Sequence, residues 1–236
     1  FSMNLPHLID ALQDTIRYGN IKLKNYKKVY SDEDVIQFSV VTLVLPDGSF
    51  VLSFSGTDGS ITGWKENLMM TYRQDLPCQI LAKDYVKKTI ANIPETSYLF
   101  GLKKKKVYPK MYLTGHSKGG NLAMYAYLKN PKLQGYIEGV KSFDGPGFVD
   151  GFWQGDEDVS KITNYIPKDS IVGRVLDHRE QTKVLDAQGS GLVQHDTLMW
   201  SVDIKDFNYC DALTKESDDL LEYVNKLLMD RPLEEK

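Results

Sequence analysis

Cysteine, long apolar runs and a surplus of charge of one sign are all scarce in this 236-residue chain. The two cysteines, Cys78 and Cys210, stand far apart with no metal-ligand spacing around them. We therefore expect neither a zinc cluster nor a disulfide framework, and we expect a reducing, cytoplasmic setting. The longest apolar stretch, residues 38–45, is interrupted by Ser39 and Thr42 and is far too short to span a membrane.

The positive and negative charges nearly balance. Lysine and arginine number 29 and aspartate and glutamate 32, so the net charge is −3, with both signs spread along the chain. Overall basicity therefore gives no reason to expect nucleic acid as a partner. The one charged block, residues 103–106, is expected to be a solvated loop, with contact to an anionic membrane surface as the alternative.

The length fits one medium-sized domain better than two small ones. Phe1 and Ser2 precede Met3, a natural start, so we take residues 3–236 as a single domain and the first two residues as a cloning remnant. Hydrophobic residues make up 42% of the chain and charged residues 26%, which is typical of an ordinary globular protein. Disordered and collagen-like classes are therefore excluded.

Expected strands and helices alternate along most of the chain. An early β-hairpin is predicted from residues 35–45 and 50–55, which are rich in β-branched and aromatic residues and flank a Pro-Asp-Gly turn. A helix near residues 5–16 is expected to cover the core. The periodicity predicts further helices at 64–72, 81–93, 121–128 and 213–229, and strands at 110–114, 140–143, 162–166, 172–176 and 183–185. This alternation predicts an α/β fold, with a mostly parallel central sheet flanked by helices and an antiparallel N-terminal hairpin.

Ser117 is the strongest candidate for a catalytic residue. It stands in the sequence Gly115-His116-Ser117-Lys118-Gly119, between a predicted strand and a predicted helix. In a G-x-S-x-G turn the serine sits in a strained strand-to-helix bend, and the two glycines relieve close contacts with neighbouring chain. The pattern predicts a serine nucleophile above the carboxyl ends of the strands; a serine that only caps the helix is the alternative.

A serine nucleophile needs a base, and the base needs an acid. Of the four histidines, we prefer His195, which follows a predicted strand and a glycine-rich loop, over His178. The acid is expected at the end of a strand that comes after the serine. We prefer Asp169, which follows the strand-like residues 162–166, although Asp144 also ends a predicted strand.

Ester chemistry also requires N–H donors for a negatively charged oxygen. The amide of Lys118, directly after the serine, is the first candidate. The second is the amide of Thr57, in the glycine-rich residues 56–59 after the hairpin, with the Thr57 hydroxyl as a further donor. Residues 147–153 carry aromatics among glycines, and two roles are equally weighted: a flap over the acyl site, or a loop that tucks its aromatics into the core.

Several ordered motifs resemble the class three lipases and, more closely, an uncharacterised bacterial lipase-like branch of the α/β-hydrolases. They run over most of the chain, from about residue 35 to residue 200. The motifs are residues 54–58 followed by Trp64, then 115–120, 164–169 and 194–196. The resemblance implies an α/β-hydrolase fold and a triad of Ser117, Asp169 and His195. It also implies oxyanion amides at Thr57 and Lys118. We expect neither a cofactor nor a metal ion.

The implied function is hydrolysis of a carboxylic ester, with a small ester or a lipid as the substrate. Acyl transfer to another acceptor and thioester cleavage would use the same residues, and a binding module without turnover is the alternative of a different class. Lys118 stands where these lipases commonly have an apolar residue, Ser55 stands where they have arginine, and no apolar lid is evident. These departures argue against a water-insoluble triglyceride as the substrate. Lys118 and residues 103–106 also predict locally positive potential.

Overall fold

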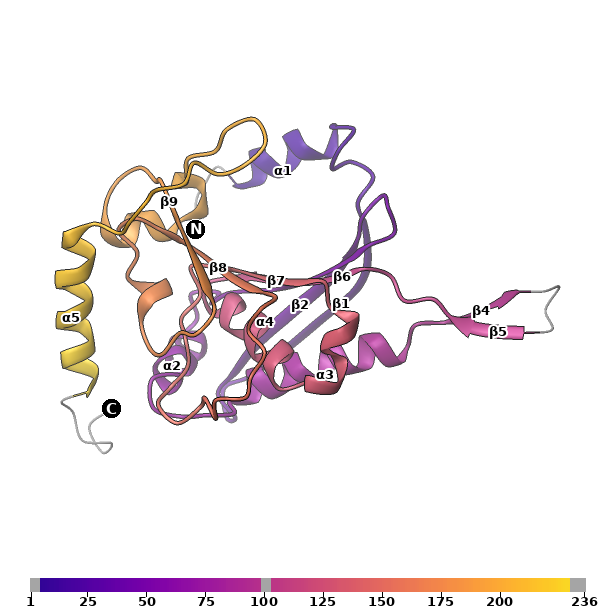
Figure 1. Ribbon diagram of the computed structural model, residues 1–236, viewed down its shortest axis with the longest axis horizontal. Coiled ribbons are helices and arrows are strands. Elements are labelled where there is room, and N and C mark those ends of the chain that lie inside the picture. Colours follow the sequence, from indigo (N-terminus) through magenta and orange to yellow (C-terminus); the bar gives the residue numbers. More distant parts are fainter. Residues whose placement is uncertain (1–4, 99–102, 230–236) are drawn as a thin grey trace.

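A seven-stranded sheet lies at the centre of the computed structural model, which describes residues 5–98 and 103–229 (Figure 1). Its strand order is β1-β2-β3-β6-β7-β8-β9. The pairs β1/β2 and β2/β3 are antiparallel, and all pairs from β3 to β9 are parallel. The strands are β1 (Lys22–Ser31), β2 (Ile36–Val44), β3 (Phe50–Phe54), β6 (Met111–His116), β7 (Gly139–Phe143), β8 (Ile162–Pro167) and β9 (Gln181–Leu185).

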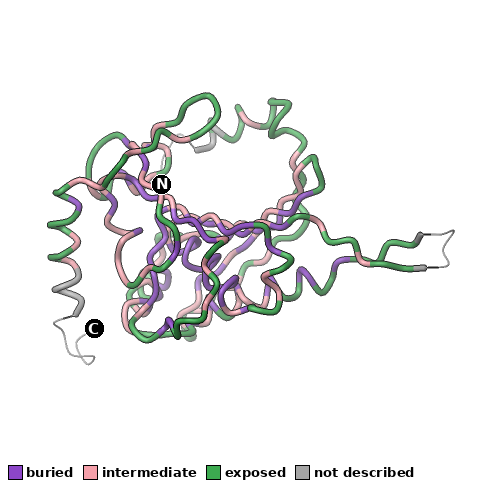
Figure 2. The backbone as a smooth tube through the Cα atoms, in the orientation of Figure 1, coloured by how far each residue is buried: buried purple, intermediate pink, exposed green. Residues whose placement is uncertain are grey.

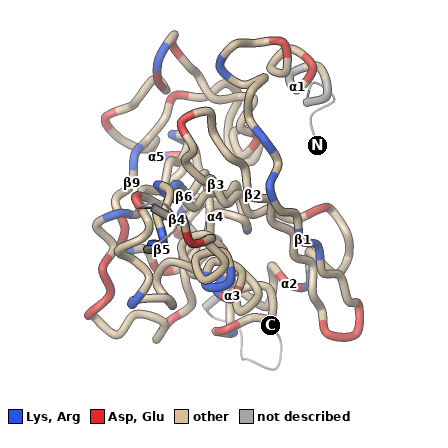
Figure 3. Tube along the Cα trace, turned by 90° about the vertical axis from the view of Figure 1, so that its right-hand side faces the viewer, with Lys and Arg blue, Asp and Glu red and all other residues tan. Residues whose placement is uncertain are grey.

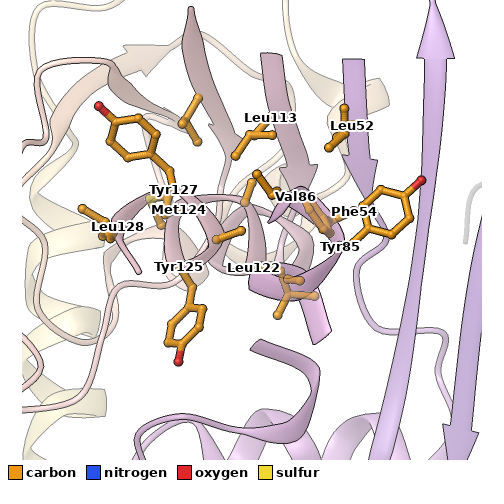
Figure 4. Packing of buried hydrophobic residues seen from close by; sticks show 14 of the residues in the cluster. Leu52, Phe54, Tyr85, Val86, Leu113, Leu122, Met124, Tyr125, Tyr127 and Leu128 are labelled. Atoms are coloured by element: carbon orange, nitrogen blue, oxygen red, sulfur yellow. The ribbon is translucent and has the colours of Figure 1, made fainter. Parts of the chain in front are cut away.

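The helices α2 (Ile61–Met69), α3 (Pro77–Ala91) and α4 (Lys118–Leu128) lie against one face of this sheet (Figure 1). The structure also describes the helices α1 (Leu5–Gln13) and α5 (Lys215–Met229). Every residue of α4 is buried, because this helix is covered on one side by the sheet and on the other by α3. Figure 4 shows Leu122 and Met124 of α4 in the same hydrophobic cluster as Leu113 of β6 and Val86 of α3.

The predicted hairpin and the predicted mostly parallel sheet are confirmed. The strand β1 was not predicted, because all of its residues are exposed or half-buried and it therefore has no apolar face to recognise. It is an edge strand, paired only with β2. Charged residues of both signs are spread along the described chain (Figure 3).

Three sequence expectations about local structure are wrong. Residues 103–106 form the strand β5 (Lys103–Lys106), which pairs with β4 (Glu95–Tyr98) in a ribbon that projects from the body (Figure 1). Residues 172–176 contain a 3-10 turn (Val172–Arg174) in place of a strand, because this segment wraps around the carboxylate of Asp144. Residues 5–16 do not cover the core, because Ile9 in α1 and Ile16, which follows this helix, are 56% and 93% exposed (Figure 2).

The described part of the chain contains no helix long and apolar enough to cross a lipid bilayer.

Candidate active site

Ser117 lies in a strained turn between β6 and α4. Its φ of 56° and ψ of −130° are unusual for a residue with a side chain, and its N–H donates to the carbonyl of Phe143 at 2.9 Å. A Cβ added at Gly115 would collide with the backbone of Gly119, and one added at Gly119 would collide with the carbonyl of Phe54. The turn therefore requires glycine at both positions, as the sequence pattern predicts.

The ring of His195 is held by Asp144. His195 ends a 3-10 turn (Gly191–His195), and its Nδ1 donates to Oδ2 of Asp144 at 2.6 Å. The buried Asp144 follows β7 directly and has a positive φ of 51°. Its other oxygen accepts from the Ser170 hydroxyl and from the Gly173 N–H at 3.0 Å. Because every partner donates to this carboxylate, it fixes a proton on Nδ1 of His195 and leaves Nε2 as the basic nitrogen.

The expected pairing of Asp169 with His195 is wrong. The carboxylate of Asp169 accepts from Nε2 of Gln194 at 2.9 Å and from the hydroxyl of Thr214. The reason lies in the sheet order: Asp144 directly follows β7, the neighbour of β6, whereas Asp169 follows β8, one strand farther from Ser117. The sequence signal in favour of Asp144 is its place directly at a strand end before a Gly-Pro-Gly turn, but the strand order that decides between the two aspartates is not visible in the sequence.

The other two histidines near this region are occupied by protein partners. His178 bonds through Nδ1 to Glu180 at 2.6 Å and through Nε2 to the Val175 carbonyl at 3.2 Å, so neither ring nitrogen is available as a base. His116 bonds through Nε2 to the carbonyl of His195 at 2.7 Å, and the two rings lie 4.5 Å apart. Burial, and secondly the nearby charge of His195, lowers the pKa of His116, so we take it as a neutral donor that supports His195.

Ser117 and His195 share neighbours, although no hydrogen bond joins their side chains within the described ranges. His116, which precedes Ser117, stacks on His195. Phe143, which accepts from the Ser117 N–H, precedes Asp144. The structure therefore brings the predicted serine and the predicted histidine to the same edge of the sheet, and it adds Asp144 in place of Asp169.

The predicted oxyanion loop runs beside Ser117. A Cβ added at Gly56 would lie 3.5 Å from the Cβ of Ser117. The backbone N–H groups of Thr57 and Lys118 donate to no acceptor in the part of the chain that the structure describes. The Thr57 hydroxyl, in contrast, is paired with the side chain of Asn67 on α2 at 2.8 Å. Of the two donors expected from Thr57, the amide is therefore the available one.

The side chain of Lys118 turns away from this site into the protein. It is buried, and its Nζ lies 2.6 Å from Oε2 of the equally buried Glu66. The predicted positive potential beside Ser117 is therefore wrong, because the charge is neutralised inside the fold. Burial and the Glu66 carboxylate also raise the pKa of the Cys78 thiol, which keeps it protonated and unreactive. Glu66 and its partner Gln37 were not anticipated, because isolated polar residues in a helix and a strand give no sequence signal.

The aromatic residues of 147–153 belong to the core. Phe148, Phe152 and Trp153 are all buried, and the rings of Phe148 and Phe152 stack at 3.9 Å. Of the two roles weighted equally from the sequence, the core-packed loop is the one that the structure has. The aromatic flap over the site is not formed, because these rings pack against Tyr125 of α4 on the helical side of the sheet.

Comparisons with known proteins agree with this architecture. The model of a family described as Mbeg1-like matches residues 12–236. No curated protein matches the chain significantly. The chain is similar to the solved lipase from Rhizopus microsporus var. chinensis, with 12% identity and a TM-score of 0.53 over 86% of this chain and 70% of that one. It is also similar to lipase II from Rhizopus niveus, with 11% identity and a TM-score of 0.51 over 87% and 77% of the two chains. At these identities the likeness shows the fold, and the predicted α/β-hydrolase fold is confirmed.

Proposed function

This chain belongs to the Mbeg1-like family, and from that premise we propose that it is a serine hydrolase that cleaves carboxylic esters through an acyl-enzyme on Ser117. One observation carries the proposal: the hydrogen bond of 2.6 Å between His195 and the buried Asp144, beside a serine in a strained strand-to-helix turn. A buried carboxylate on Nδ1 orients an imidazole and stabilises its cation, which is the support that a catalytic base requires. The likeness in fold to lipases supports lipid esters as a substrate class.

The acylation step follows from the positions of these groups. Nε2 of His195 takes the hydroxyl proton of Ser117 as Oγ forms a bond to the ester carbonyl carbon. The carbonyl oxygen becomes negatively charged and accepts from the amides of Thr57 and Lys118. When the C–O bond to the leaving group breaks, the imidazolium returns the proton to the departing alcohol, and the acyl group remains on Ser117.

Deacylation repeats the same steps with water. His195 takes a proton from a water molecule, whose oxygen attacks the acyl carbon, and the proton then returns to Oγ of Ser117 as the carboxylic acid leaves. Acceptors other than water, and thioesters in place of esters, would pass through the same acyl-enzyme. The acceptor is therefore an outcome of the experiment and does not alter the roles of the residues.

The proposal is tested by covalent labelling and by turnover. We expect a fluorophosphonate probe to label the wild-type protein at Ser117 and p-nitrophenyl esters of graded acyl length to be hydrolysed. Ser117→Ala should abolish labelling and lower kcat by about 10³-fold or more. Ser160→Ala, which alters an exposed serine, is the matched control and should retain both activities. Full hydrolysis by Ser117→Ala would refute the assignment, and a folded wild type that is neither labelled nor active would indicate a binding module.

A further inference from the structure

A buried polar cluster forms around the side chain of Lys118, the residue that follows Ser117. It consists of Gln37 on β2, Glu66 on α2 and the side chain of Lys118 at the start of α4, and we call it the lysine clamp. The Lys118 ammonium donates to Oε2 of Glu66 at 2.6 Å, to the backbone carbonyl of Gln37 at 2.7 Å and to Oε1 of Gln37 at 2.5 Å. An ammonium has three donors, so all of them are used inside the protein.

The clamp fixes the orientation of the Gln37 amide. Because Oε1 of Gln37 accepts from Lys118, its Nε2 must point the other way, and there it donates to the carbonyl of Gly56 at 3.4 Å. The carbonyl of Gly56 and the N–H of Thr57 belong to one planar trans peptide, so they point in opposite directions. Holding the carbonyl toward Gln37 therefore aims the Thr57 N–H away from the clamp.

The clamp also reaches the same loop through α2. Glu66, which binds Lys118, precedes Asn67, whose side chain binds the Thr57 hydroxyl. The loop that carries the second oxyanion amide is thus held on one side by Gln37 and on the other by α2. One ammonium group contacts both supports, because Lys118 binds Gln37 directly and α2 through Glu66.

We propose that the buried Lys118 side chain is a positioning group that sets the aim of the Thr57 amide. This inference rests on the proposed function. Lys118 would then have two roles at the oxyanion site: its backbone N–H is one donor, and its side chain positions the second donor, the N–H of Thr57. A buried ion pair is a weak source of stability compared with apolar side chains of the same volume, so fold stability alone gives little reason for a lysine at this position.

Two variants separate positioning from folding. Replacing Lys118 alone would leave the Glu66 carboxylate buried without its cation, so the double variant Lys118→Met/Glu66→Met removes both charges together. Gln37→Met keeps the ion pair and removes the side-chain amide of Gln37, which donates to the Gly56 carbonyl and accepts from Lys118. Thr42→Val is the matched control, since it breaks a buried hydrogen bond of 2.7 Å to Tyr85 from the same strand as Gln37.

The experiment measures kcat and KM separately for short p-nitrophenyl esters and compares how much each changes in the variants. Loss of one oxyanion donor costs roughly 10²- to 10³-fold in kcat, so a misaimed donor should cost about tenfold or more in both test variants. KM should stay within about twofold, because the interaction is made in the transition state. Thr42→Val should keep its kcat while losing a comparable amount of stability in urea unfolding.

Several results would overturn the inference. If folded Gln37→Met keeps a kcat within about twofold of the wild type, the clamp does not position the amide. The same conclusion follows if Thr42→Val, at matched stability, loses as much kcat as the test variants. Should the double variant fail to fold, Gln37→Met decides. Failure of the proposed function is recognised separately, because the wild type would then neither be labelled by a fluorophosphonate nor hydrolyse any ester, and both proposals would fall together.

Discussion

Asp169 accepts a hydrogen bond of 2.9 Å from Gln194, the residue that precedes His195. The Gln194 side chain is buried and also donates to the Gly189 carbonyl at 2.8 Å, so Asp169 anchors the loop that carries the histidine. The ring of that histidine is bound instead by Asp144. Two carboxylates thus hold His195: Asp169 anchors the loop that carries it, and Asp144 binds its ring.

The two aspartates should differ sharply when each is replaced by asparagine. Asp144→Asn removes the acceptor that sets the tautomer of His195, so we expect kcat for ester hydrolysis to fall by about 10³- to 10⁴-fold. Asp169→Asn keeps an oxygen for one of its two partners, so we expect less than about a tenfold loss. Steady-state kinetics on one short ester, with urea unfolding of both variants, measures the contrast. Equal losses, or a larger loss for Asp169→Asn, would contradict the assignment of Asp144 as the triad acid.

A substitution at Thr57 tests whether its backbone N–H or its hydroxyl donates to the oxyanion. Thr57→Val deletes the hydroxyl that pairs with Asn67 but keeps the backbone N–H. We expect a loss of about 0.5–1.5 kcal/mol in the free energy of unfolding, the usual worth of one hydrogen bond, and only a few-fold loss in kcat. A loss of roughly 10²-fold or more in a stably folded variant would mean that the hydroxyl itself binds the oxyanion.

Phe152 distinguishes a core loop from an acyl-binding flap. It is 2% exposed and stacks on Phe148, so Phe152→Ala should lower the free energy of unfolding by about 3–5 kcal/mol. Phe152→Leu is the milder variant for kinetics. We expect its ratio of kcat/KM between long and short acyl esters to equal that of the wild type. A selective loss on long chains would show that this aromatic contacts the acyl group.

The parts of the site that could be predicted are those written in contiguous sequence. Gly115 and Gly119 predict the strand-to-helix turn at Ser117, because only a residue without Cβ fits at these two positions. The choice between Asp144 and Asp169 could not be made, because it depends on which strand lies next to β6 and on a positive φ at Asp144. Neither property is visible in the local pattern of residues.

The same distinction applies to the fold. The hairpin β2–β3 and the parallel strands have apolar residues at strand spacing, so their positions could be predicted. The edge strand β1 and the ribbon β4–β5 could not, because pairing through the backbone alone leaves no hydrophobic periodicity. The lysine clamp could not be predicted either, because its three residues lie on three separate elements and come together only in the folded chain.

The lowered pKa of His116 predicts that the free energy of unfolding depends on pH. Its folded-state pKa lies below the ordinary value of 6.5, chiefly because of burial, so below about pH 6.5 the unfolded chain binds a proton that the folded chain resists. The free energy of unfolding should therefore fall as the pH decreases through this window. His116→Gln cannot titrate, and its amide can donate to the His195 carbonyl, so it should lose less stability than the wild type between about pH 7.5 and pH 5.5. Urea unfolding across this range measures the difference, with the exposed His7→Gln as control. Parallel profiles for the wild type and His116→Gln would show that this ring is not held neutral by the fold.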